Sequence, residues 1–158
     1  DDVYYPLNWL SGLLKSYKKF PKAVSARRVH LMKKNGNELA FYNYWEDQCR
    51  RVKSPSFSLI ATGCSGILYP PHSLKPEAFD EKSFEELCFD ADDIWLKCME
   101  VLNDIPVVWV KNWEVDPLDV ADSTKGALSS LNVDYRKNDA YLHNVMDHFK
   151  IPVEKFFR

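Results

Sequence analysis

The chain has 158 residues, of which 46% are hydrophobic and 14% aromatic. This composition is typical of one folded domain with a sizeable core and argues against intrinsic disorder. The formal net charge is −2, with both signs interspersed, so we expect no general nucleic-acid-binding surface. No apolar run reaches the roughly 18 residues that a membrane-spanning helix needs.

The amino-terminal third predicts a helix followed by a hairpin. Apolar residues at helical spacing predict the helix, with Asn8 as its cap and Pro21 at its end. Alternating polar and apolar residues then predict strands over 23–33 and 38–42. The Asn35-Gly36 pair between them is a strong turn signal, so we expect these strands to form a hairpin.

The rest of the chain alternates between strand and helix patterns. We expect strands over 56–63 and 105–115, one short and one longer helix within 80–105, and a closing helix over 138–150. Strands separated by helices predict an α/β fold in which a mixed sheet is flanked by helices. The chain lacks the glycine-rich βαβ unit of dinucleotide-binding domains.

The four cysteines are Cys49, Cys64, Cys88 and Cys98. No two of them have the close spacing of a zinc knuckle, so a zinc site is not expected. Two disulfides are possible in principle. The sparse spacing and the absence of a signal-peptide pattern favour reduced thiols and a cytoplasmic protein.

Two acidic pairs are candidates for chemistry. Asp1 and Asp2 offer hard oxygen ligands for Mg²⁺ or Mn²⁺, or they are a solvated terminus. Asp92 and Asp93 fall in the first turn of a predicted helix, where the helix dipole favours carboxylates without any function. Alternatively, one of them is a general base kept ionised by that dipole, and Trp95 is either the wall of a sugar site or part of the core.

Basic residues and glycines form two further candidates. Arg28 and His30 share one face of a predicted strand, where they need an anionic partner; a diphosphate or an acidic side chain at 46–47 would serve. Gly63 and Gly66 in "TGCSG" allow a ligand to approach the main chain, or they only form a tight turn. His143 and His148 are five residues apart, which is not the spacing of a two-ligand metal site.

Three segments together resemble one family. "DDVYYPLNWLSGLLKSYKKFPKAVSARRVHLM", "TGCSGILYPP" and "ADDIWLKCMEVLNDIPV" have the order and spacing of bacterial glycosyltransferases of the GT-A fold that act in capsule and lipopolysaccharide synthesis. The resemblance extends to about Trp113 and weakly through "RKNDAYLHNVMDHF". It implies that residues 1–158 are the acceptor-side, carboxy-terminal part of a GT-A domain, and that an amino-terminal nucleotide-binding half precedes them.

The resemblance also implies residue roles. It makes Asp93 the catalytic base of an inverting transferase and assigns the acceptor to Asp92, Gly63, Ser65, Gly66 and Trp95. It assigns the donor to Arg28 and His30, and a Mn²⁺ or Mg²⁺ ion to Asp1 and Asp2. "RRVH" departs from the commoner His-Arg-x-His pattern by placing Arg27 first, and the cysteine of "TGCSG" stands where glycine or valine is commoner, so Cys64 is given no role.

The expected substrates are a nucleoside-diphosphate sugar and a saccharide or lipid-linked saccharide acceptor. The expected location is the cytoplasm or the inner face of the membrane, and a homodimer is possible because a cut sheet edge invites pairing. Two other functions stay open. One is a non-catalytic carbohydrate- or partner-binding module, and the other is a Mg²⁺-dependent phosphotransferase or hydrolase.

Overall fold

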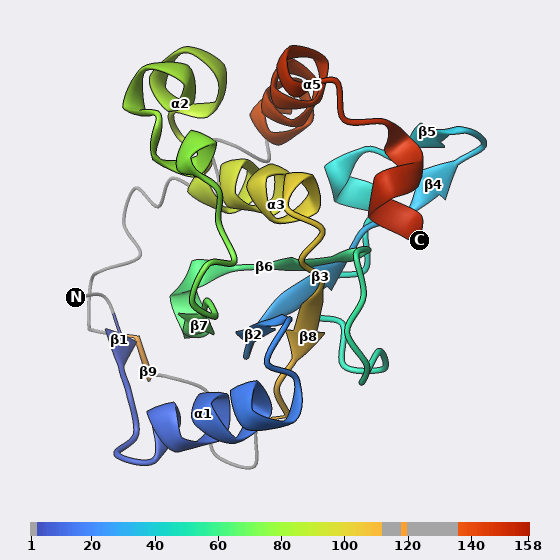
Figure 1. Cartoon of the computed structure of the whole chain (residues 1–158). Helices are drawn as coiled ribbons and strands as arrows, with labels where there is room; N and C mark the ends of the chain where they lie inside the picture. The colour runs from blue at the N-terminus through green and yellow to red at the C-terminus, as the bar shows by residue number, and fades with distance from the viewer. Residues whose placement is uncertain (1–2, 112–117, 120–135) are drawn as a thin grey trace.

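The computed structural model describes residues 3–111, 118–119 and 136–158. These residues form a mixed α/β structure with strands between two layers of helix (Figure 1). Helices α2, α3 and α5 lie together on one side of the strands, and α1 lies on the other. The bounds of the helices are α1 Trp9–Lys19, α2 Glu81–Cys88, α3 Asp92–Leu102 and α5 Lys137–Phe149.

The strands within the described residues are short and form four small sheets. Strand β2 pairs in parallel with β8 and antiparallel with β7, so this three-stranded sheet is mixed. The other pairs, β1–β9, β3–β6 and β4–β5, are all antiparallel. Their bounds are β1 Val3–Tyr4, β2 Val24–Ala26, β3 Val29–Leu31, β4 Lys34–Asn35, β5 Glu38–Leu39, β6 Leu59–Ala61, β7 Ile67–Leu68, β8 Val107–Trp109 and β9 Leu118–Asp119.

The predicted hairpin of 23–33 with 38–42 is wrong in its extent. The Asn35-Gly36 turn does connect two strands, but these are only β4 and β5. Upstream, the chain bends at Arg27 and Arg28, so that β2 and β3 enter different sheets. An alternating pattern shows that a segment is extended, but it does not say which strand is the partner.

Helices α3 and α5 bury the apolar stripes that their periodicity predicted, whereas on α1 Leu13 is buried but Leu10 and Leu14 are exposed. On α3, Ile94, Cys98 and Val101 are buried, and on α5, Leu142 and Val145 are buried. Both stripes join one core cluster between the helices and the strands. A second cluster lies among the strands around Val24, Leu59 and Val107. The two clusters fix α3 above β6, which places the amino-terminal end of α3 beside the loop that follows β6.

All four cysteines are free thiols. Asp90 precedes Ala91, the N-cap of α3, and its carboxylate accepts from Lys137 Nζ at 3.0 Å and from the Tyr141 hydroxyl at 3.3 Å. Among the residues that the structure describes, no helix has the length and apolar character needed to cross a bilayer.

Candidate active site

The amino-terminal turn of α3 meets the loop 62–66. Asp93 Oδ1 accepts a hydrogen bond from the Gly63 backbone N–H at 3.0 Å. The loop forms a short 3-10 turn, Gly63–Ser65, which the Gly66 N–H closes onto the Gly63 carbonyl at 3.0 Å. Two segments that are 30 residues apart in sequence are therefore joined by one charged contact, at a place where Gly63 and its neighbour Cys64 are exposed.

The surroundings of Asp93 raise the pKa of its carboxyl group to about 7. Burial is the main cause, and the charge of Asp92 adds to it; the Gly63 hydrogen bond and Arg28 act in the opposite direction. The sequence had suggested that the helix dipole keeps this carboxylate ionised. Burial instead leaves it near half ionisation at neutral pH, which is the range in which a general base works well.

This raised pKa predicts a pH-dependent stability gain in Asp93→Asn. A carboxyl group whose folded pKa lies above its unfolded value stabilises the fold below the unfolded pKa, and that stability is lost as the pH rises through about 7. An amide carries no charge, so above pH 7 we expect the variant to be more stable than the wild type by about 1 kcal/mol or more. Urea unfolding at pH 5 to 8 measures the difference, which should shrink toward low pH.

The matched control for this prediction is Asp147→Asn, which removes an exposed carboxylate on α5. It should change the free energy of unfolding little at any of these pH values. If Asp93→Asn and Asp147→Asn show the same pH dependence, burial does not raise the pKa of Asp93.

Arg28 and His30 lie on the other side of the same loop. The Arg28 guanidinium donates to Cys64 Sγ at 2.9 Å and lies 4.0 Å from Asp47. His30 is buried, and its Nδ1 lies 2.8 Å from Asp47 Oδ1 and 3.0 Å from the Gln48 N–H. Burial lowers the pKa of His30, while Asp47 raises it. Asp47 is thus the acidic side chain that the sequence offered as an alternative to a diphosphate.

On the β3–β6 side of this loop, two buried polar atoms have no hydrogen-bond partner in the described part of the chain. They are Arg28 Nε and Thr62 Oγ1. The two residues are neighbours across the β3–β6 pair, because the Thr62 N–H donates to the Arg28 carbonyl at 3.1 Å. Buried polar groups are nearly always paired, so these two leave capacity for a ligand at this position.

Tyr42 is a site residue that the sequence analysis missed. Its ring packs on Trp45 with centroids 4.8 Å apart and contacts His30 edge-on at 6.0 Å. Burial and the negative charge of Asp93 raise its pKa to about 12, so the hydroxyl stays protonated. Tyr42 follows the β4–β5 hairpin, in a segment whose sequence was irregular, and no local pattern connects it to Asp93.

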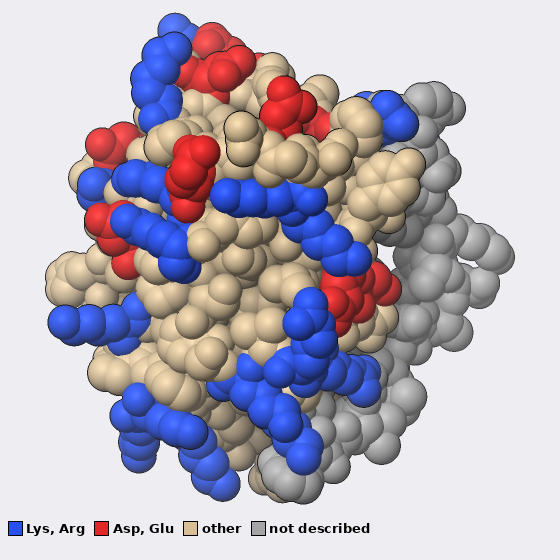
Figure 2. All heavy atoms as spheres, turned by 90° about the vertical axis from the view of Figure 1, so that its right-hand side faces the viewer, with Lys and Arg blue, Asp and Glu red and all other residues tan. Residues whose placement is uncertain are grey.

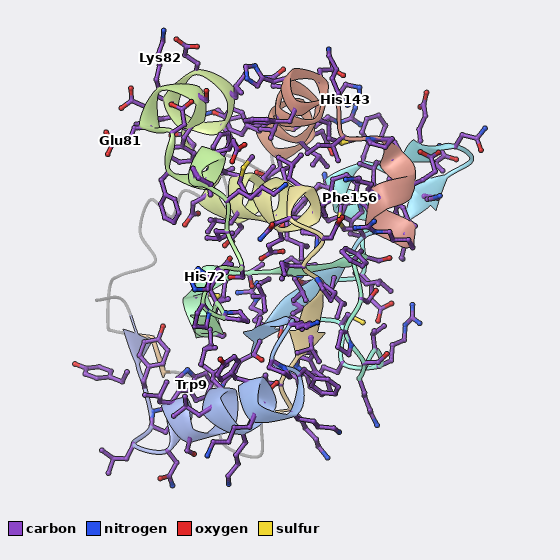
Figure 3. The ribbon with its side chains drawn as sticks, viewed as in Figure 1. Trp9, His72, Glu81, Lys82, His143 and Phe156 are labelled. Carbon is purple, nitrogen blue, oxygen red and sulfur yellow. The ribbon has the colours of Figure 1, made fainter. Side chains whose placement is uncertain are left out.

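Gly66 lies against α1 at the far end of the loop. Its φ of +90° is unfavourable for residues with a side chain, and a Cβ there would be 2.9 Å from Trp9 Nε1. Trp9 lies between α1 and the strands (Figure 3) and is 6% exposed. Gly66 is therefore explained by close packing against Trp9, and this accounts for it without a ligand.

We expect Gly66→Ala to lower the free energy of unfolding by about 2–3 kcal/mol, because it adds a steric clash to a strained backbone. Gly36→Ala is a matched control, since Gly36 has a φ of +63° and open space at the Cβ position. Gly36→Ala should lower the free energy of unfolding by only about 1 kcal/mol, the cost of a left-handed backbone conformation for a residue with a side chain. Equal losses in the two variants, measured by urea unfolding, would show that contact with Trp9 is unimportant.

The other predicted acceptor residues differ in their exposure. Asp92 is exposed beside Asp93, whereas Ser65 is buried beneath the loop. Trp95 is only 3% exposed; its ring packs against Phe84 and Phe149, and its Nε1 donates to a backbone carbonyl at 3.0 Å. The indole has no face toward solvent, so the assignment of Trp95 as a sugar-stacking wall is corrected to a core residue.

The predicted metal ligands, Asp1 and Asp2, lie outside the described residues. Within residues 3–111, 118–119 and 136–158, no three His, Cys, Asp or Glu side chains are grouped so that they could hold a metal ion. His143 and His148 are both exposed on α5, and His143 lines a pocket that it shares with residues of β4 and β5.

The structure thus brings together Asp93, the 62–66 loop, Arg28 and His30 from separate segments. The cluster has a carboxylate able to accept a proton near neutral pH, exposed backbone at Gly63, and a guanidinium about one-third exposed (37%). Such a set can bind a hydroxyl-bearing ligand and an anion side by side and can move a proton between them. Comparison of the chain with models of protein families, with curated proteins and with solved structures gives no match.

Proposed function

We propose that this chain is the acceptor-side half of an inverting glycosyltransferase of the GT-A fold, which moves a sugar from a nucleoside-diphosphate donor to a hydroxyl acceptor in the synthesis of a surface polysaccharide. The observation that supports it best is the contact between Asp93 and Gly63, because it joins two of the three segments that carry the resemblance. The mixed α/β architecture is compatible with this fold.

In the proposed reaction, Asp93 accepts the proton of the acceptor hydroxyl as that oxygen attacks the anomeric carbon. Attack occurs on the face opposite the bond to the diphosphate, so the configuration at that carbon inverts. Asp92, exposed next to the base, and the backbone at Gly63 would bind the acceptor. Arg28, whose side chain is partly exposed, would carry positive charge toward the leaving diphosphate.

A divalent cation completes the proposal. The resemblance assigns Mn²⁺ or Mg²⁺ to Asp1 and Asp2, where the ion would neutralise charge on the departing diphosphate. Carboxylate oxygens suit both ions, and such ions commonly bridge to substrate phosphates.

The test is acceptor-dependent release of nucleoside diphosphate. Since the resemblance implies a nucleotide-binding half before this chain, the assay uses protein that includes it, with Mn²⁺ and a panel of nucleotide sugars. We expect release to require both the cation and a saccharide acceptor. Release of phosphate without an acceptor would replace the proposal with a phosphotransferase or hydrolase. Saccharide binding without turnover would replace it with a non-catalytic module.

A further inference from the structure

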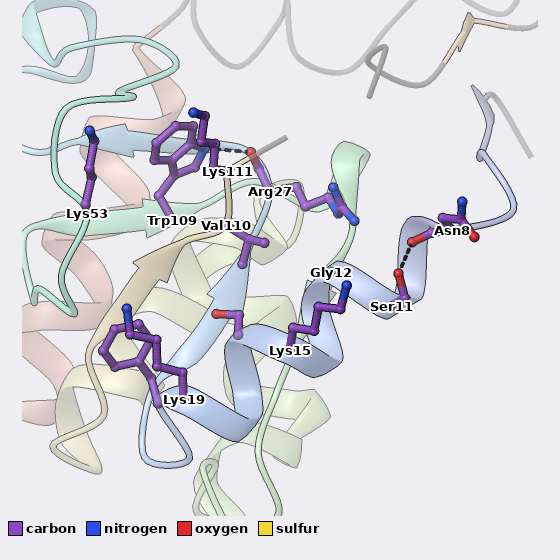
Figure 4. A pocket seen from close by; sticks show the side chains of 12 residues that line it. Asn8, Ser11, Gly12, Lys15, Lys19, Arg27, Lys53, Trp109, Val110 and Lys111 are labelled. Carbon is purple, nitrogen blue, oxygen red and sulfur yellow. Dashed lines mark hydrogen bonds between the residues drawn. The ribbon is translucent and has the colours of Figure 1, made fainter. Parts of the chain in front are cut away.

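A second concave site lies on the α1 side of the strands, away from Asp93. It has a volume of about 420 Å³ and is bounded by α1, by the residues after β8 and by the loop that carries Lys53 (Figure 4). That volume falls within the roughly 300–1,000 Å³ typical of small-molecule sites. None of the residues described around Asp93 lines this pocket. Arg27, which does line it, is the chain neighbour of Arg28.

The lining of this pocket is strongly basic. Its cationic residues are Lys15, Lys19, Arg27, Lys53 and Lys111. Among the described residues, no Asp or Glu lines it. The wider surface has the same character: in Figure 2, the lower part of the face, at the height of α1, carries Lys and Arg as its only charged side chains among the residues that are coloured. Cations from four separate segments therefore converge on one cavity, although the chain as a whole is slightly acidic.

Packing fixes the floor of the pocket. Arg27 is 5% exposed, its guanidinium stacks on the Trp9 ring at 3.9 Å, and it donates to the Trp9 carbonyl. A side chain at Gly12 would overlap that guanidinium. Trp109 forms an aromatic wall, and its Nε1 donates to the Arg27 carbonyl at 3.1 Å. The positive charge is thus held in place by the fold rather than carried only on mobile side chains.

The pocket also lies where α/β sheets place ligands. Strands β2 and β8 are parallel, and Arg27 and Val110 are the residues that follow their carboxyl ends. The Val110 N–H donates to the Ala26 carbonyl at 2.8 Å, which keeps the two strand ends in register. Crevices outside the carboxyl ends of parallel strands are the usual ligand sites of open α/β sheets.

From this convergence we propose that the pocket lined by Lys15, Lys53 and Trp109 binds a phosphate-bearing ligand. Several cations around one cavity match a group with two or more negative charges, and lysine ammonium groups are common phosphate ligands. The aromatic wall provides contact area for whatever carries the phosphate. This site is independent of the proposed transfer reaction and needs neither Asp93 nor a metal ion.

The experiment measures binding of inorganic diphosphate by titration calorimetry in EDTA, with intrinsic tryptophan fluorescence as a second readout. We expect saturable binding that Lys15→Glu and Lys53→Glu each weaken by about tenfold or more, the effect of losing a charge-assisted contact. Lys18→Glu is the matched control, because Lys18 is an exposed residue of α1 outside the pocket and the variant has the same net charge as Lys15→Glu. It should weaken binding less than about twofold.

A second arm identifies the source of the phosphate. Vesicles of phosphatidylcholine with phosphatidic acid test whether the ligand is a lipid headgroup. Weaker binding by Lys15→Glu than by Lys18→Glu supports the site, whether it is seen with diphosphate or with vesicles. The proposal is overturned if neither diphosphate nor vesicles bind, or if Lys18→Glu weakens binding as much as Lys15→Glu. It is also overturned if Arg28→Ala abolishes diphosphate binding while Lys15→Glu does not, a result that would place the anion beside Asp93 and leave the transferase proposal standing.

Discussion

Lys97→Ala is expected to lower the free energy of unfolding by about 3–5 kcal/mol, because it leaves the Glu100 carboxylate buried without its cation. Lys97 Nζ lies 3.5 Å from Glu100 Oε2 on α3, and both side chains are 1% exposed. Burial raises the pKa of Glu100 and lowers that of Lys97, while the charge of each partner acts against the shift of the other. A hydrogen bond with the Tyr69 hydroxyl also acts against the raised pKa of Glu100. Urea unfolding measures the loss.

The control for this prediction is the double variant Lys97→Met/Glu100→Leu. It replaces both charges with apolar groups of similar volume, so it should be close to the wild type in stability, or above it. The contrast separates the charge of the pair from the space it fills. A loss below about 1 kcal/mol in Lys97→Ala would contradict the buried ion pair, as would a double variant that is as unstable as the single one.

Asp93→Asn is expected to reduce kcat/KM for sugar transfer by about 10²–10⁴-fold, the range attributed to a general base. The variant keeps an oxygen that can accept from the Gly63 N–H, so the loop geometry should survive. In the wild type, activity should rise with pH through about 7 as Asp93 ionises. The measurement is a pH–rate profile of both proteins, and unchanged transfer in Asp93→Asn would remove Asp93 from the mechanism.

Asp92→Asn is the partner experiment. Asp92 raises the pKa of Asp93 through its charge, so its removal should move the rising limb of the profile to lower pH. Because Asp92 is exposed and is proposed to bind the acceptor, we expect a higher KM with kcat largely kept. A loss of kcat in Asp92→Asn as large as that in Asp93→Asn would instead make the two carboxylates one functional unit.

The sequence by itself determined the elements whose signal is local. Apolar spacing located α1, α3 and α5, and Asn35-Gly36 located a turn, because each depends on residues a few positions apart. It also singled out Arg28, the 62–66 loop and Asp93 as candidates. Arg28 and His30, which the sequence placed on one face, both approach Asp47, whereas Arg27 stacks on Trp9.

Only the tertiary structure decided what these residues touch. Trp95 and Lys97 are ordinary residues of an amphipathic helix in sequence. In the structure, Trp95 is a core residue packed against Phe84 of α2 and Phe149 of α5, and Lys97 is half of a buried ion pair with Glu100. The raised pKa of Asp93 and the convergence of Lys15, Lys53 and Lys111 on one pocket also arise only in the tertiary structure. Burial, desolvation and charge clustering depend on contacts between distant segments, and no local pattern of residues encodes them.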